Sequence, residues 1–437
     1  MIGRAARRLL ALLGACALTA CAALPTPTPS PEAVAPTRAG QTATATLTPT
    51  ATSTPPPPAI RLWLPALFAY ESELFTAAHL SDLLEDYTRQ SGQSVAVRLR
   101  RADGLGGIFE TLSSAAPVAS SVIPDAVLLR ARDLPRAAAA RLIVPLSPTL
   151  LSEQAYFGAA LALARYQGEF YGIPHLLELQ HAVYRGQTPP ATWQSLISRQ
   201  IPYLFAAGVA RGVNSTLLSH YLTLGGKLSD QNGEPSLDGE PLLSLLRLYS
   251  AARAAGSLPV EVLDYADPTQ YWSAFVAGRN AIVQVDSTFY LRQSAQSGSA
   301  ERAAWQLSAL PQIESDKPLL SPVDGWLWAF TTADGARQQR ALALIEWLQE
   351  PERFAAFTQR VGMLPARRDA LRAWSERDYA AFVAPLLDAN PVLPPDSVNG
   401  ILAEALQESF ARLLRGELDA ESAAESALER ARAARER

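Results

Sequence analysis

The sequence contains very few of the residue types that build disulfides, metal sites and basic surfaces. Its 437 residues include two cysteines, Cys16 and Cys21, both near the N-terminus. The rest of the chain can therefore form neither an intrachain disulfide nor a cysteine-rich metal site. Lysine occurs only at Lys227 and Lys317, and the formal net charge is −4. Because nucleic-acid-binding proteins normally carry a basic surplus, we expect no nucleic-acid partner.

Sequence motifs of common enzymes are also missing. The histidines form neither an HExxH motif nor a pair spaced by four residues, and there is no GxSxG motif, no P-loop and no GxGxxG at a strand–helix junction. The stretch Gly104–Gly107 is too short to cradle a phosphate. We therefore expect a protein that is not an enzyme and that holds neither a cofactor nor a metal. A secreted hydrolase is the weakest alternative.

The N-terminus has the three parts of a secretory signal. Three arginines precede the apolar run Leu9–Leu18, which is too short to span a bilayer, so residues 1–20 are predicted to be a signal peptide. The run ends in LTAC, which resembles the bacterial lipobox, where the cysteine is lipidated and becomes the new N-terminus. We predict that Cys21 is the lipidation site and that the protein is extracytoplasmic and anchored to the cell membrane. The alternatives are a plain signal peptide with an incidental cysteine and a similar site that ends at Cys16.

The segment that follows Cys21 cannot form a hydrophobic core. Residues 21–58 consist mainly of Pro, Thr, Ala and Ser. Such a composition favours an extended, partly polyproline II tether, whose length at about 3.1 Å per residue reaches roughly 100 Å. The sequence leaves open whether this tether is glycosylated.

Beyond residue 58, segments with strand periodicity alternate with segments with helix periodicity. Strands are predicted at 59–65, 95–99, 123–129, 280–285, 307–310 and 325–330, and helices at 73–90, 109–115, 134–140, 214–224, 238–255, 270–277, 336–349, 401–415 and 420–435, with a further helix beginning at Thr192. Residues 286–288 are predicted to be a turn or the start of a helix. This alternation predicts an α/β protein with a largely parallel sheet.

The stretch Gly168–Arg185 stands at the centre of this arrangement. A predicted tight turn at Gly168-Glu169 leads to Pro174, which favours extended geometry in the residue before it. The mainly apolar run that follows is long enough to leave one lobe and enter another. A strand that crosses between lobes acts as a hinge, and ligands bind beside hinges.

Six segments then match, in order, the motifs of one family. They are PDAVLLRARDLPRAAAARLIVPL (124–146), GEFYGIP (168–174), TWQSL (192–196), AFVAGRNAIV (274–283), ALALIEWLQEPERFAAF with VGMLPAR (341–367) and LLRGELDAESAAESAL (413–428). In these segments the chain resembles the extracellular solute-binding proteins of ABC importers, in the sugar-type group that includes maltodextrin-binding protein.

The resemblance implies a two-lobed, periplasmic-binding-protein-like α/β fold of type II, with discontinuous lobes joined by hinge crossovers. Lobe one would comprise residues 59–177 and 328–395, and lobe two residues 182–325 and 396–437. Such a protein captures a small solute, here a carbohydrate, between closing lobes and delivers it to ABC permease subunits. We expect it to be a monomer. The alternative is a lipoprotein of the same fold that senses a solute or holds a partner without a role in transport.

The resemblance also implies a ligand site at the crossovers. The predicted ligand-binding residues are Glu178 before the first crossover, Asp324 and Trp326 on the second, Arg130 and Arg132 after the strand at 123–129, Asn214 and Ser215 at a helix start, and Asp286, Ser287 and Tyr290 after AFVAGRNAIV. Each has a structural alternative, such as a hinge-paired carboxylate for Glu178 or solvated charges for the two arginines. Family members frequently have a tryptophan after AFVAGRNAIV, and its replacement by Thr288-Phe289-Tyr290 leaves the type of sugar open.

Overall fold

The computed structural model describes residues 58–68, 77–119, 122–186, 188–208, 214–231, 234–313, 322–389 and 400–435. The predicted signal peptide, the predicted lipidation site Cys21 and the predicted tether up to residue 57 lie outside the described residues. None of the described helices is long and apolar enough to cross a membrane.

The first half of the main sheet is built from three parallel strands and one antiparallel strand. β1 (Ile60–Pro65) pairs in parallel with β2 (Val95–Arg100) and with β3 (Ala126–Arg130), and β10 (Val323–Phe330) joins β3 antiparallel. β1 and β3 are almost wholly buried, as expected for strands covered by helices on both faces, whereas β2 at the edge is largely exposed.

A single long strand, β6 (Ile173–Tyr184), continues this sheet into its second half. Its residues up to Leu179 pair antiparallel with β10, and β11 (Leu364–Pro365) pairs beside them. From Gln180 onward β6 pairs instead with β8 (Ile282–Asp286) and β9 (Gln306–Ser308), and β7 (Tyr203–Leu204) runs parallel to β8. The sheet order is β2-β1-β3-β10-β6-β8-β7, and β6 changes partners between Leu179 and Gln180.

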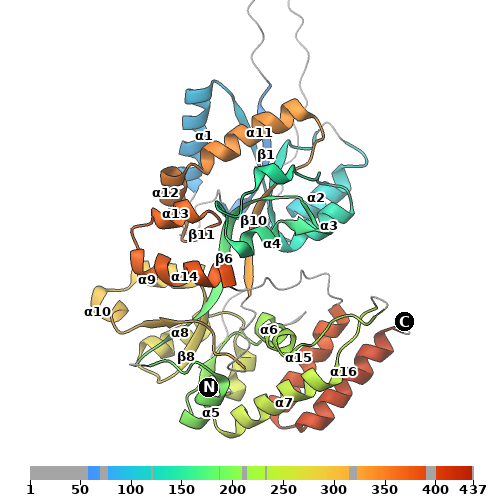
Figure 1. The fold of residues 1–437 in the computed structure, drawn as a ribbon, viewed down its shortest axis with the longest axis vertical. Coiled ribbons are helices and arrows are strands. Elements are labelled where there is room, and N and C mark those ends of the chain that lie inside the picture. The colour runs from blue at the N-terminus through green and yellow to red at the C-terminus, as the bar shows by residue number, and fades with distance from the viewer. Residues whose placement is uncertain are drawn as a thin grey trace, which may run out of the picture. The chain divides into compact units, whose positions relative to one another are not determined.

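Two hydrophobic cores form on either side of this change of partner, and Figure 1 shows β6 passing from the elements of one core to those of the other. The first core contains buried residues between 60 and 179 and between 323 and 387, and the second contains buried residues between 182 and 310 and between 402 and 431. Each core thus draws on segments far apart in the sequence.

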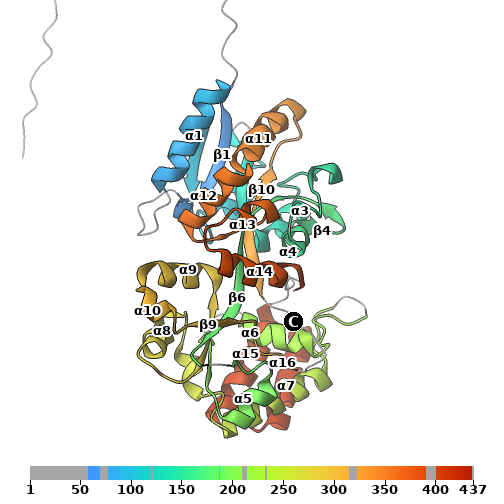
Figure 2. The ribbon, with the colours of Figure 1, turned by 60° about the vertical axis from the view of Figure 1, so that its left-hand side comes forward.

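Helices surround both cores. Around the first core are α1 (Ala77–Ser91), α2 (Ile108–Ala115), α3 (Leu134–Ala139), α4 (Gly158–Leu163), α11 (Gly335–Leu348), α12 (Pro351–Val361), α13 (Arg368–Arg372) and α14 (Arg377–Ala389). Around the second are α5 (Trp193–Arg199), α6 (Ser215–Thr223), α7 (Gly239–Ala254), α8 (Thr269–Val276), α9 (Ser287–Gln296), α10 (Ser299–Arg302), α15 (Gly400–Arg415) and α16 (Ala420–Arg435). Figure 2 shows α14 and α9 beside β6, where the elements of the two cores meet.

The structure differs from the sequence prediction in several features. The main sheet is mixed and not largely parallel: β1 pairs in parallel with β2 and β3, and β7 with β8, whereas β10 and β6 form antiparallel pairs with all their neighbours. The turn before β6 is centred on Gln167 and Gly168, both with positive φ, inside a hairpin of β4 (Arg165–Tyr166) and β5 (Glu169–Phe170), so Glu169 is already in a strand. The predicted turn at 286–288 is the start of α9, which continues to Gln296. The helices α4, α10, α12, α13 and α14 were not predicted.

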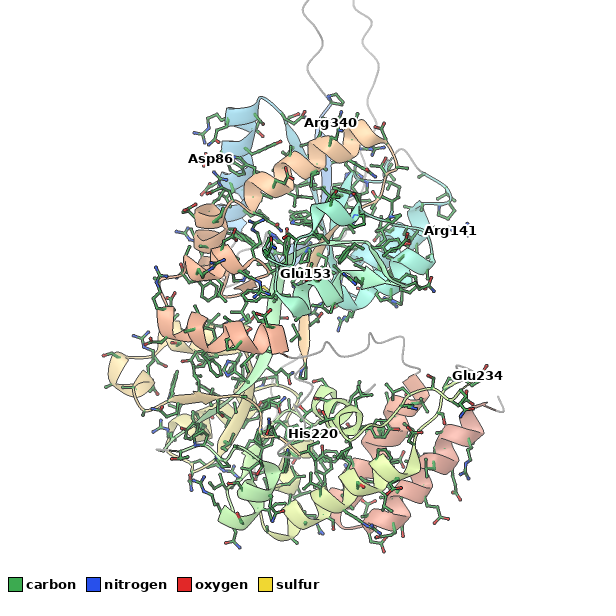
Figure 3. The ribbon with its side chains drawn as sticks, viewed as in Figure 1. Asp86, Arg141, Glu153, His220, Glu234 and Arg340 are labelled. Carbon is green, nitrogen blue, oxygen red and sulfur yellow. The ribbon has the colours of Figure 1, made fainter. Side chains whose placement is uncertain are left out.

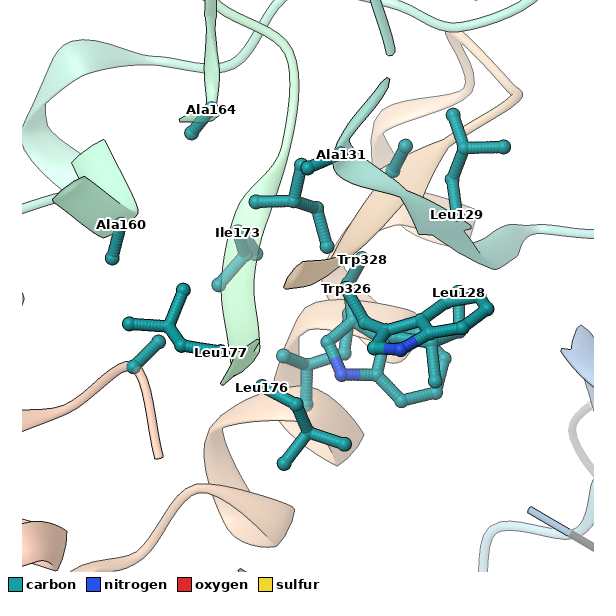
Figure 4. Packing of buried hydrophobic residues seen from close by; sticks show 14 of the residues in the cluster. Leu128, Leu129, Ala131, Ala160, Ala164, Ile173, Leu176, Leu177, Trp326 and Trp328 are labelled. Atoms are coloured by element: carbon teal, nitrogen blue, oxygen red, sulfur yellow. The ribbon is translucent and has the colours of Figure 1, made fainter. Parts of the chain in front are cut away.

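Large buried side chains lie in each of the two cores. Figure 3 labels His220 among the helices of the second core, and its side chain is fully buried there. Trp326 and Trp328 are buried in the first core, and Figure 4 shows their rings near Leu128.

Candidate functional site

Sheet register places four of the predicted site residues on three neighbouring strands. Trp326 of β10 lies opposite Arg130 of β3, and Asp324 of β10 lies opposite Glu178 of β6. Because residues two apart on a strand point to the same face and paired residues share a face, all four side chains project from one face of the sheet.

The contacts follow from this register. Arg130 Nη2 lies 3.5 Å from Glu178 Oε2, and Arg130 Nε lies 3.5 Å from Asp324 Oδ2. The guanidinium also lies over the Trp326 ring, 5.2 Å from its centroid, in cation–π geometry. Arg130 and Glu178 each keep between a fifth and a quarter of their side-chain surface exposed, so both remain accessible to a small molecule.

A loop between β2 and α2 adds a carboxylate that the sequence analysis did not select. Asp103 Oδ2 lies 3.6 Å from Arg130 Nη1, and Asp103 Oδ1 accepts a hydrogen bond of 2.5 Å from Arg132 Nη2. The available signal was an acidic residue directly before the glycine-rich stretch Gly104–Gly107. We call Asp103, Arg130, Arg132, Glu178 and Asp324 the crossover ion cluster.

The second core contributes the N-terminus of α9 to the same place. The Thr288 hydroxyl donates a 3.0 Å hydrogen bond to Glu178 Oε1, and the buried Ser287 hydroxyl accepts a 3.1 Å bond from the Leu179 amide. Asp286 caps the helix by accepting from the Phe289 amide at 2.7 Å. Asp286 and Ser287 therefore hold the helix start, and the unpredicted Thr288 contacts the cluster.

A neutral polar network continues along β6. Gln180 donates to the Ser215 hydroxyl at 3.3 Å and accepts from the Gln284 amide. Gln284 also donates to the Thr216 hydroxyl at 2.7 Å. Of the two predicted residues at the start of α6, Ser215 thus joins the site, whereas Asn214 is buried and caps α6 by accepting from the Thr216 amide at 2.8 Å.

The two predicted aromatic contacts have other packing partners. Trp326 is 2% exposed and packs edge-to-face on Phe68 at 5.3 Å, so its ring belongs to the core and only supports Arg130. Tyr290 stacks on Tyr379 of α14 with ring centroids 4.9 Å apart, and edge-to-face on His181 at 5.3 Å. His181 Nε2 lies 3.1 Å from the Tyr379 hydroxyl.

These last three rings form a second connection between the cores. His181 is on the second half of β6, Tyr290 is on α9 and packs against both cores, and Tyr379 belongs to the first core. Phe382 of α14 packs edge-to-face on His181 at 5.5 Å. We call His181, Tyr290, Tyr379 and Phe382 the aromatic joint.

The electrostatics of the site depend on Glu178. Burial raises the pKa of this carboxyl to about 7; the charges of Asp286 and Asp324 add to the rise, and Arg130 and the Thr288 hydrogen bond oppose it. Burial likewise raises the pKa of Asp286. Near neutral pH Glu178 exchanges between its two protonation states, so it can accept or donate a hydrogen bond to a ligand hydroxyl.

The arrangement suits the binding of a polar solute. Carboxylates, guanidinium groups, amides and hydroxyls are the groups that recognise a polyhydroxylated molecule, and here they gather at the residue where β6 leaves one core for the other. Within the described ranges, no group of three or more His, Cys, Asp and Glu side chains is arranged to hold a metal ion.

Comparison with solved structures shows the same fold in other binding proteins. The sugar-binding protein MalE of Xanthomonas citri has a TM-score of 0.70 at 18% identity, covering 87% of this chain and 97% of its own. The GacH receptor of Streptomyces glaucescens, solved unliganded and with acarbose, has a TM-score of 0.63 at 16% identity, covering 87% and 98%. The extracellular solute-binding protein of Staphylococcus aureus, in complex with maltose, has a TM-score of 0.65 at 15% identity, covering 86% and 98%.

Comparison of the sequence gives the family. Curated protein sequences yield no match. A profile described as bacterial extracellular solute-binding protein matches residues 82–383, which is more than half of the chain. The two-lobed fold predicted from the sequence is confirmed, and the protein is a binding protein rather than an enzyme. The chain belongs to the bacterial extracellular solute-binding protein family.

Proposed function

We propose that the protein captures a carbohydrate between two closing lobes and delivers it to the permease of an ABC importer. The observation that carries this proposal is the gathering of Arg130, Glu178 and Asp324 where β6 changes partners between the two cores. A ligand that bound there and also reached Gln180 and Ser215 would contact groups from both cores, so closing the lobes around it would strengthen its binding.

The lobe boundaries of the proposal follow the sequence prediction. Lobe one comprises residues 59–177 and 328–395, and lobe two comprises residues 182–325 and 396–437. The two cores support this division, except that Val323 falls in the range of lobe two and is buried in the first core.

The proposed ligand contacts are the polar groups of the crossover ion cluster with Gln180 and Ser215. The carbohydrate class is supported by the sugar-binding protein of X. citri and by the maltose complex of S. aureus, which share the fold. Trp326 is left out of the proposed contacts because it is buried, and Asn214 because its side chain caps α6.

The proposed location is the outer face of the cell membrane. Lipidation of Cys21 would anchor the chain, and the Pro- and Thr-rich tether would let the binding domain reach a permease as a monomer. Metabolic labelling with a palmitate analogue tests the anchor: wild type is expected to be labelled, and Cys21→Ser to remain unlabelled. Equal labelling of both would contradict it.

A thermal-shift screen tests the ligand. A ligand that binds only the folded state raises the midpoint of unfolding, by an amount that grows with its concentration over Kd. We expect a mono- or oligosaccharide to raise it in a panel that also contains amino acids, polyamines and phosphate esters.

Two variants make this screen specific to the site. Arg130→Gln removes the centre of the cluster and is expected to abolish the sugar-induced shift. Arg247→Gln breaks an exposed ion pair between Arg247 of α7 and Glu421 of α16 and is expected to leave the shift intact. A shift produced only by a non-sugar, or one that survives Arg130→Gln, would show the carbohydrate site to be wrongly assigned.

A further inference from the structure

The Glu178 carboxylate is held from both cores at once. Its Oε1 accepts from Thr288 of α9, which belongs to the second core, and its Oε2 lies 3.5 Å from Arg130 of β3, which belongs to the first. Glu178 itself precedes the change of partner on β6 by one residue. One carboxylate therefore connects the two cores through side-chain contacts.

The neighbours of Thr288 fix its hydroxyl in this position. Ser287 accepts from the Leu179 amide, which ties the first turn of α9 to β6, and Asp286 caps the same turn. With anchors on the two residues before it, Thr288 has little freedom to direct its hydroxyl elsewhere. The hydrogen bond between Thr288 and Glu178 therefore follows from the way the backbone of α9 is held against β6.

We propose that Thr288 is a positioning residue for solute binding: its hydroxyl stabilises the Glu178 carboxylate by a hydrogen bond and directs it at Arg130, so that the binding site is assembled by a bond between the two cores. The proposal rests on the proposed function, because it concerns how that site is prepared for its ligand.

The charges around Glu178 explain why the bond is needed. Asp324 faces it from β10 and Asp286 from the end of β8, and both disfavour its ionised form, as burial does. Arg130 from β3 favours ionisation, but Asp103 from the β2–α2 loop and Asp324 share that guanidinium. The Thr288 hydroxyl adds a neutral donor to the ionised carboxylate, and hydrogen bonds of this kind are among the stronger ones in proteins.

Removing the hydroxyl should therefore lower the ionised fraction of Glu178 near physiological pH. In Thr288→Val we expect the titration midpoint of Glu178 to rise by at least ~0.5 pH unit, because the ionised form loses a hydrogen bond. Thr288→Ser keeps a hydroxyl at the same point and is expected to restore the wild-type midpoint. A residue with a purely structural role would change stability without moving this midpoint.

The measurement uses the full-length chain with selectively ¹³C-labelled glutamate. The Glu178 side-chain carboxyl resonance is assigned by its absence in Glu178→Gln and followed by NMR from pH 4 to pH 9. Thr223→Val is the matched control, because it removes a threonine hydroxyl of α6 that is buried and donates to the Ser219 carbonyl within that helix. Thr288→Ala provides a second hydroxyl-free variant if the valine variant does not fold.

The binding of maltose, measured by calorimetry on the same proteins, connects the titration to function. Thr288→Val is expected to bind at least about two-fold more weakly than wild type at pH 7, because a midpoint raised from about 7 by ~0.5 unit halves the ionised fraction of Glu178, and nearly normally at pH 9. An unchanged Glu178 midpoint in both hydroxyl-free variants overturns the proposal. A shifted midpoint with no maltose binding in any variant supports the positioning of Glu178 and counts against the proposed function instead.

Discussion

At the scale of single residues, Gly325 decides how closely the two central strands approach. A Cβ at this position would lie 2.4 Å from the Leu176 carbonyl oxygen and 3.1 Å from a methyl group of Leu177, closer than packed atoms allow. Gly325→Ala must push β10 away from β6 and is expected to lower the free energy of unfolding by about 1–3 kcal/mol, measured by urea titration. It should also disturb the opposed pair of Asp324 and Glu178.

Gly335 offers the matched control for that substitution. It is the first residue of α11, and an added Cβ there meets no atom within 4 Å. Gly335→Ala is expected to leave stability unchanged or to raise it by up to ~1 kcal/mol. Equal losses for both variants would show that the tight contact between β6 and β10 does not limit stability.

The raised pKa of Glu178 leads to a second prediction for single residues, which concerns how the free energy of unfolding depends on pH. The pKa of Glu178 is about 7 in the folded chain against an ordinary 4.5, so the folded state holds a proton that the unfolded state has released. The resulting stabilisation is complete below about pH 4.5 and is lost as pH rises through about 7. Glu178→Gln should therefore match wild type near pH 4.5 and exceed it by roughly 1–3 kcal/mol at pH 8.5. Equal pH profiles would contradict the raised pKa.

At the scale of elements, α14 connects the first core to the crossover strand and to α9 through the aromatic joint. Tyr379→Ala removes a buried ring that stacks on Tyr290, and it is expected to cost about 3–5 kcal/mol in urea unfolding. Tyr379→Phe keeps the ring, loses only the bond to His181, and is expected to cost ~1 kcal/mol.

A tyrosine outside the joint provides the comparison. The Tyr171 hydroxyl bonds only to the exposed Glu169 carboxylate, at 3.3 Å, among the described contacts. Tyr171→Phe should change stability by less than about 0.5 kcal/mol. A loss as small as this for Tyr379→Ala would show that the joint does not hold α14 in place.

Some elements were predicted closely and others were missed. The prediction for 238–255 corresponds to α7 at Gly239–Ala254, and the prediction for 336–349 corresponds to α11 at Gly335–Leu348. For α9 the sequence predicts at most a helix start at 286–288, because STFYLRQSAQ has no continuous apolar stripe. Only Ser287 and Phe289 of this helix are buried. The two-residue strand β7 is too short to carry an alternating pattern.

At the scale of the whole molecule, sequence predicted which segments meet but not which side chains are left free to bind. The resemblance to the family selected Glu178, Asp324 and Arg130 as site residues. They lie close together in the structure because the register of their strands follows from the fold. The burial of Trp326 depends on its packing against Phe68, from a distant part of the sequence, and the contact of Thr288 depends on where α9 begins. Neither leaves a local pattern in the sequence.

The stability of both cores also depends on pH through three buried histidines, His175, His181 and His220. Burial lowers their pKa values to about 3, 4 and 3. The unfolded chain binds protons on all three below about pH 6.5 while the folded chain does not, so stability falls as pH drops from 6.5 towards 4. Glu178 acts in the opposite direction in this window, and the raised pKa of Asp286 adds to its effect at the acid end, but the three histidines together have the larger effect. The free energy of unfolding should thus fall by on the order of 5 kcal/mol between pH 7 and pH 4.5.

His175→Gln separates this cause from general acid destabilisation. His175 stacks on Phe354 in the first core, and its Nδ1 lies 3.3 Å from Gln349 Nε2, a contact that the glutamine amide can replace. The variant should be less stable than wild type at pH 7.5, because the stacking is lost, yet its stability should decline less steeply between pH 6.5 and pH 4.5. Chemical denaturation at half-unit pH intervals measures both quantities, and parallel curves would contradict the assignment. Since His175 and His220 lie in different cores, His220→Gln should flatten the curve by a similar amount, which makes acid sensitivity a property of both cores and not of the binding site.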